Sequence, residues 1–103
     1  MLSSAPATAD TAQDDRQFLS TLQSIGLTIY DPAQLISQAH MVCNEGLAHG
    51  VGWREIRARM IGWGYSVWAS SLVIANATFT YCPEHREVAD EIQADDLFRR
   101  SSG

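Results

Sequence analysis

Two cysteines, Cys43 and Cys82, set the tightest limit on how this chain folds. They stand far apart in a sequence of 103 residues, and each lies within apolar residues of helical spacing, so both are expected to be buried. A disulfide between them would stabilise the fold by about 4 kcal/mol, a large share of a total of roughly 5–15 kcal/mol. Two separate buried thiols, as in cytosolic proteins, are the alternative. A zinc site needs more closely paired ligands, and no cysteine–histidine spacing marks a catalytic thiol.

Apolar residues at helical spacing predict a first helix that begins near Thr11 and ends at Gly26, where a left-handed cap fits. Its apolar stripe consists of Phe18, Leu19, Leu22 and Ile25. A second helix starts where Asp31 can act as the cap and Pro32 suits the first helical position. This helix is expected to end near Gly50.

A short third helix is predicted over residues 51–61, and a fourth begins where Ser66 can act as a cap and ends before Pro83. The third helix is expected to point Trp53, Ile56 and Met60 inward. The arginines Arg54, Arg57 and Arg59 are expected to point mostly outward. The inner stripe predicted for the fourth helix is Trp68, Leu72, Ala75, Phe79 and Cys82.

The predicted organisation is one helical domain over residues 11–83 with a segment on either side. Residues 1–10 are small, polar and aperiodic, and are expected to be disordered. Residues 84–103 form an acidic tail, for which a fifth amphipathic helix and a solvated segment are equal alternatives. The fold class is therefore all-α: a compact bundle of four helices, or five if the tail folds, stapled by one disulfide.

Charge and hydropathy exclude two classes of partner. The chain has a net charge of −5, and its seven basic residues are all arginines, scattered along the sequence. Nucleic-acid binding needs a concentrated basic surface, so we do not expect it. The longest apolar stretch, residues 65–82, is interrupted by serine, threonine and asparagine, and it reads as a buried helix of a soluble protein rather than as a membrane span.

The N-terminus bears on the compartment. Residues 5–7 and 7–9 are both small-x-small patterns directly before the acidic Asp10, as at the junction of a signal peptide and a mature protein. We interpret the chain as a mature form with an added Met1. The alternative is a native cytoplasmic protein with a flexible tail.

A series of short motifs resembles a known family. The motifs are residues 15–22 with their Phe-Leu-x-x-Leu pattern, then Gly26, Asp31, Val42-Cys43, Gly50 and Tyr81-Cys82-Pro83. In this order they are similar to the small secreted actinobacterial proteins, chiefly mycobacterial, of the domain of unknown function 732 family. The resemblance implies export through a signal peptide, a compact helical fold and one disulfide between these two cysteines, and it implies no activity. Gly46, the Gly62-Trp63-Gly64 run and the longer charged tail depart from the family pattern.

Four aromatic residues form the candidate ligand or partner surface: Trp53, Trp63, Tyr65 and Trp68, flanked by glycines. Tryptophan and tyrosine dominate the energetics of many binding surfaces. The alternative is that Trp53 and Trp68 fill a small core and only Trp63 is partly exposed.

Cofactor and enzyme hypotheses find little support. Residue types that ligate haem are present, but no Cys-x-x-Cys-His motif accompanies them. They are His40, His49, His85, Tyr30, Tyr65, Tyr81 and Met41. A carboxylate-rich turn lacks the spacing of a calcium loop and is interpreted as a solvated helix face. Its members are Glu84, Glu87, Asp90 and Glu91. No Gly-x-Ser-x-Gly or His-Glu-x-x-His motif occurs, so we expect no catalytic residue, no metal and no cofactor.

The function predicted from these observations is that of an exported, non-enzymatic protein of the cell envelope or secretome that interacts with an unknown protein partner. One alternative is a carrier of a small apolar ligand, with haem as the extreme case. Another is a cytoplasmic regulatory module, if Met1 is native.

Overall fold

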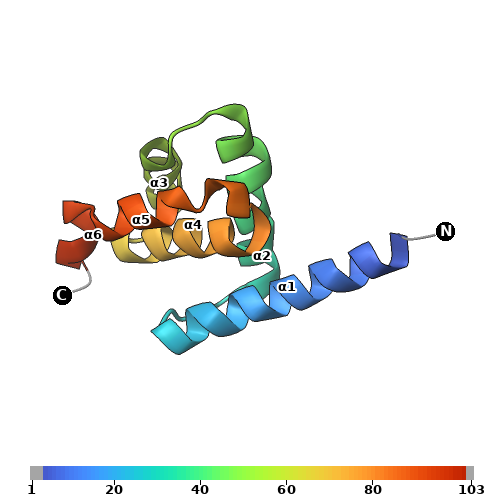
Figure 1. The fold of residues 1–103 in the computed structure, drawn as a ribbon. Helices are drawn as coiled ribbons and strands as arrows, with labels where there is room; N and C mark the ends of the chain where they lie inside the picture. The colour runs from blue at the N-terminus through green and yellow to red at the C-terminus, as the bar shows by residue number, and fades with distance from the viewer. Residues whose placement is uncertain (1–3, 102–103) are drawn as a thin grey trace.

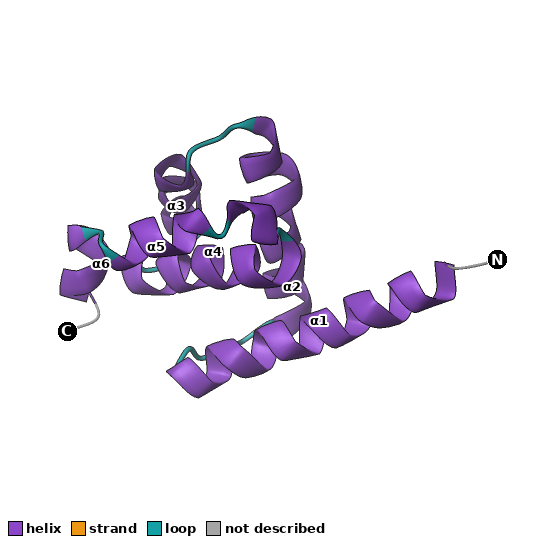
Figure 2. Ribbon diagram, viewed as in Figure 1, coloured by secondary structure: helices purple, strands orange, loops and turns teal. Residues whose placement is uncertain are grey.

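A computed structural model describes the backbone of residues 4–101 and the side chains of residues 11–101. Within this range every regular element is helical (Figures 1 and 2). The α-helices are α1 (Ser4–Ile25), α2 (Pro32–Met41), α3 (Trp53–Gly62), α4 (Val67–Tyr81), α5 (Glu87–Gln93) and α6 (Asp96–Ser101). The all-α class predicted from the sequence is confirmed, although the described residues contain six helices rather than four or five.

Helix α4 is the centre of the fold, and α1, α2, α3, α5 and α6 all contact it (Figure 1). Because neighbours surround it, α4 is buried on several sides, and Val73, Ile74 and Ala77 are fully inaccessible. The predicted inner stripe is wrong at Phe79, which is 55% exposed. A helix that is apolar nearly all round has no polar face from which the direction of its inner stripe can be read.

Helix α1 ends as predicted and begins earlier than predicted. Gly26 follows it with a φ of +114°, and Phe18 and Leu22 are fully buried. The sequence predicts disorder up to residue 10, but residues 4–10 continue the helix; residues 1–3 lie outside the described part. Alternating alanines in this segment favour helix, because alanine has the highest helix propensity.

One carboxylate joins α1 to α2 and α4. The Oδ1 atom of Asp15 accepts a hydrogen bond from the Tyr81 hydroxyl at 2.5 Å and lies 3.1 Å from Nε2 of His40. The Tyr81 ring also contacts Phe18, with 5.4 Å between ring centroids, and His40, with 4.2 Å. Burial, followed by the hydrogen bond and charge of Asp15, raises the pKa of Tyr81 far above its usual value.

Helix α2 begins with the predicted cap and is followed first by a wider helical turn and then by a tighter one. Asp31 Oδ1 accepts the amide of Gln34 at 3.1 Å, with Pro32 at the first helical position. A π-helical turn (Val42–Gly46) and a 3₁₀ turn (Leu47–His49) follow, and Gly50, with a φ of +81°, ends the path where the sequence predicts.

A disulfide joins Cys43, in the π-helical turn, to Cys82, the residue after α4. The sulfur–sulfur distance is 2.04 Å and the Cα atoms are 5.8 Å apart. Both residues are only 3% exposed, so the bond belongs to the core. It connects the segment that follows the C-terminus of α2 to the C-terminus of α4.

The charged C-terminal segment folds onto the domain. A 3₁₀ turn (Pro83–His85) leads into α5, which buries Val88, Ala89 and Ile92 against α4. Of the two alternatives for residues 84–103, the helical one therefore holds for the residues described, and α6 extends it.

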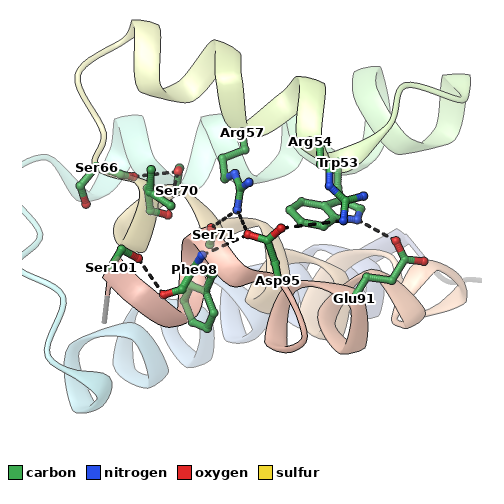
Figure 3. A network of polar contacts seen from close by, with 11 residues as sticks. Trp53, Arg54, Arg57, Ser66, Ser70, Ser71, Glu91, Asp95, Phe98 and Ser101 are labelled. Atoms are coloured by element: carbon green, nitrogen blue, oxygen red, sulfur yellow. Dashed lines mark hydrogen bonds and ion pairs between the residues drawn. The ribbon is translucent and has the colours of Figure 1, made fainter. Parts of the chain in front are cut away.

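Arg57 is a correction to the predicted outward arginines of α3. Its side chain is 6% exposed, and Nη1 donates to Asp95 Oδ2 at 2.8 Å and to Ser71 Oγ at 3.2 Å. Figure 3 shows Arg57 pointing from α3 toward Asp95, which lies between α5 and α6. The prediction failed because the partner carboxylate comes from the segment that was equally well explained as a solvated tail. Arg54 and Arg59 are exposed, as expected.

Asp95 also begins α6, since its Oδ2 accepts the amide of Phe98 at 3.0 Å. Burial by itself would raise the pKa of Asp95. The hydrogen bonds from Arg57 and Phe98 and the charges of Arg57 and Arg54 outweigh burial and lower the pKa below its usual value. The carboxylate is therefore ionised at neutral pH and locks α3 to the C-terminal helices.

Candidate binding groove

Two interhelical loops and the starts of α2 and α4 line a groove of about 880 Å³ that is open to solvent. Residues 26–31, between α1 and α2, form one wall together with residues 34, 35 and 38 of α2. Residues 63–66, between α3 and α4, form the other wall together with residues 68 and 69 of α4.

Local sequence signals build both loops in the same way. Each loop contains, at or next to its first residue, a glycine with a positive φ, +114° at Gly26 and +112° at Gly64, a conformation that glycine adopts without the strain of a Cβ atom. Each ends at a capping side chain, Asp31 for α2 and Ser66 for α4, which accepts a backbone amide three residues later. The loops are therefore short and fixed at both ends.

Three of the four predicted aromatic site residues meet in this groove. Trp63 is 52% exposed, whereas Tyr65 and Trp68 are partly buried and pack against the core. The Tyr65 hydroxyl donates to Oε1 of Gln38 and so connects the α3–α4 loop to α2. Burial raises the pKa of Tyr65 above its usual value.

Trp53, the fourth predicted residue, lies elsewhere. It is 4% exposed, and its Nε1 donates to Glu91 Oε1 of α5 at 2.8 Å (Figure 3). The guanidinium carbons of Arg54 and Arg57 lie 4.4 and 4.9 Å from its ring centroid. Trp53 thus packs in the core, as the alternative interpretation of the tryptophans has it.

Sequence reasoning missed the opposite wall of the groove. Leu27, Ile29 and Tyr30, between α1 and α2, are not part of the predicted surface, yet they line the same groove as Trp63 and Trp68, and Tyr30 is 91% exposed. A large aromatic residue directly before a helix cap, where polar residues are usual, was the available signal.

The candidate ligands for haem or metal do not gather at the groove. Its lining contains no histidine, cysteine or methionine, and His40 is bonded to Asp15 instead. Among the described residues, no group of three or more histidine, cysteine or acidic side chains is arranged to hold a metal ion. Glu84, Glu87 and Asp90 line a separate surface pocket together with Phe79.

The fold and groove together define a class: small helical domains with one internal disulfide and an open surface groove. The chain belongs to the family described as "Protein of unknown function (DUF732)", which matches residues 13–84 and so includes both cysteines and the whole groove. An uncharacterized protein of Mycobacterium bovis is 32% identical over 85 residues, which cover 79% of this chain and 74% of the relative. Uncharacterized proteins from two strains of Mycobacterium tuberculosis match to the same extent.

No solved structure matches this chain. Over the residues that the structure describes, none of the helices has the length and apolar character required to cross a membrane.

Proposed function

We propose that this protein is an exported, non-enzymatic protein of the cell envelope or secretome that binds a protein partner through the groove. The observation that carries the proposal is that two exposed aromatic side chains, Tyr30 and Trp63, line the groove. Two further exposed apolar residues, Ile25 and Ile61, lie close to the groove loops in the sequence. Exposed apolar residues grouped beside a groove are typical of interaction sites.

Export is supported by the disulfide and by the residues at the N-terminus. A buried cross-link between Cys43 and Cys82 is compatible with an oxidising compartment, where such bonds form and persist. The small-x-small patterns before Asp10 add to this. The cytoplasmic alternative predicts instead that both thiols are reduced in the cell.

A binding role accounts for the groove better than carriage of a small apolar ligand. A carrier encloses its ligand in a mostly apolar cavity. This groove is open, and Gln34, Gln38 and Ser66 interrupt its apolar lining. A mixed, open surface suits a protein partner, whose own polar groups can be satisfied across it.

Fractionation and thiol labelling in a mycobacterial host test the export half of the proposal. The gene is expressed from its natural start, and free thiols are alkylated before the cells are lysed. Mass spectrometry of the protein then shows how many cysteines carry the label. We expect an oxidised protein outside the cytoplasm. A cytoplasmic protein with two alkylated thiols would refute export.

Site-specific photo-crosslinking tests the binding half. A benzophenone amino acid at position 30 should yield a discrete protein adduct in intact cells, because Tyr30 is 91% exposed at the groove. The matched control places the same group at Phe79, which is 55% exposed and outside the groove. Equal adducts from both positions, or none from position 30, would contradict the proposed surface.

A further inference from the structure

The loop between α1 and α2 carries unused backbone hydrogen-bonding groups. The amides of Thr28, Ile29 and Tyr30 form no hydrogen bond with any described residue, and Asp31 has an extended backbone, with φ −136° and ψ +91°. Thr28 and Tyr30 are exposed and Ile29 is partly buried, and all three line the groove. A second chain in extended conformation supplies the donors and acceptors that such a segment lacks.

The groove lining contains an acidic side chain and no basic one. Asp31 is the only acidic or basic residue in the groove lining, and the chain as a whole has a net charge of −5. A partner segment with lysine or arginine complements this carboxylate, whereas an acidic segment or an anionic membrane surface is repelled.

The α3–α4 side of the groove lining offers an apolar contact for one side chain of a ligand. Trp63 is half-exposed and Trp68 is partly buried, and both line the groove. A large apolar side chain that packs against these rings in the groove is removed from water, which favours binding.

We propose that the groove binds an extended, basic peptide segment of a partner protein. The main chain of the segment pairs with residues 28–30, one large apolar side chain packs against Trp63 and Trp68, and a flanking lysine or arginine lies next to Asp31. This inference rests on the proposed binding function and names the chemistry of its ligand.

Selection from a phage-displayed library of random dodecapeptides tests the proposal on the oxidised full chain. Enriched sequences are expected to carry an aromatic or large aliphatic residue flanked by lysine or arginine. They should be enriched on the natural sequence and not on Trp63→Ala. Absence of a consensus, an acidic consensus, or equal enrichment on Trp63→Ala overturns the proposal.

Fluorescence anisotropy with the selected peptide then separates its two side-chain contacts, at Trp63 and Asp31. Trp63→Ala should weaken binding about tenfold or more, as for an interface anchor. Asp31→Asn keeps a helix cap but removes the charge, and should weaken binding about two- to fivefold at low salt. Phe79→Ala, an exposed aromatic outside the groove, should leave the affinity unchanged.

Methylation of alternate peptide nitrogens tests the backbone pairing, because it removes donors and leaves the side chains in place. We expect at least about a tenfold loss for one alternation of methyl groups and a smaller loss for the other, since only one edge of an extended peptide faces the loop. Equal, small effects of both would overturn the pairing.

Vesicles of phosphatidylglycerol provide the membrane alternative, and binding to them through Trp63 would refute the peptide proposal. If no peptide binds but the crosslink at position 30 persists in cells, the proposed function stands and this inference alone fails. Loss of the crosslink, by contrast, removes the proposed function itself.

Discussion

Replacing Arg57 by methionine should destabilise the protein by about 3 kcal/mol, because it leaves a carboxylate inside the fold without its main partner. Methionine keeps an unbranched apolar stem and a good helix propensity, so the packing of α3 is largely preserved. The Arg57 and Asp95 side chains are 6% and 10% exposed, which places the pair among buried ion pairs. Breaking such a pair by removing one partner costs about 3–5 kcal/mol.

The lower end of that range applies here, because Asp95 keeps two favourable contacts. The Phe98 amide still donates to it at 3.0 Å, and the guanidinium of Arg54 remains 3.8 Å away. For a domain of this size, a loss of about 3 kcal/mol lowers the melting temperature by roughly 12–24 °C.

Urea unfolding of the oxidised protein, followed by circular dichroism at pH 7, measures the effect. The matched control is Arg59→Met, which breaks an exposed pair with Glu55 on the same helix and should cost less than about 0.5 kcal/mol.

The difference between the natural sequence and Arg57→Met should also depend on pH. Since the folded state lowers the pKa of Asp95, the pair stabilises the protein fully above the unfolded pKa of about 4, and this contribution disappears as the pH falls through the lowered folded pKa. The two proteins should therefore converge in stability toward pH 2. A loss below 1 kcal/mol at pH 7, or a loss that is the same at both pH values, would refute this account of Arg57.

Three further predictions follow from contacts described above. Replacing Cys43 and Cys82 together by alanine should lower the free energy of unfolding by about 4 kcal/mol, measured in urea, and a change below about 1 kcal/mol would contradict a structural role for the bond. Gly64→Ala should cost about 1–2 kcal/mol because the φ of +112° strains a residue with a Cβ atom, whereas alanine at Gly62, whose added Cβ would meet no neighbour within 4 Å, should cost nothing comparable. The folded state raises the pKa of Tyr81, so the contribution of this hydroxyl to the free energy of unfolding is complete below about pH 10 and is lost as the pH rises beyond that value. The free energy of unfolding of Tyr81→Phe should therefore decline less between about pH 9 and 11 than that of the natural sequence, in the same assay.

Features set by neighbouring residues could be predicted from the sequence. The cap at Asp31, the glycine that ends α1 and the boundary at Pro83 each depend on a few adjacent residues, and the structure has all of them. The buried Phe18 and Leu22 likewise follow from helical spacing on an otherwise polar helix.

Features set by distant residues could not be predicted. The partner of Arg57 comes from a segment 38 residues later, and that segment was ambiguous between a helix and a tail. The outward direction of Phe79 depends on which neighbours surround α4, and an almost uniformly apolar helix does not encode that. Only one part of the groove lining was predicted. Tryptophans close to glycines indicate a candidate binding surface, whereas a single tyrosine such as Tyr30 in the segment between two helices does not.

The position of the disulfide has a mechanical consequence for the groove. The disulfide joins the C-terminal ends of the paths that α2 and α4 begin, whereas the groove is lined by residues near the starts of both helices, among them Leu35 and Ala69. At 1.5 Å per helical residue, Leu35 lies about 12 Å along the helical path from Cys43, and Ala69 lies about 20 Å along α4 from Cys82. Because the bond keeps α2 and α4 from separating at that end, it restricts the movements of the two helices that could widen the groove at the other end.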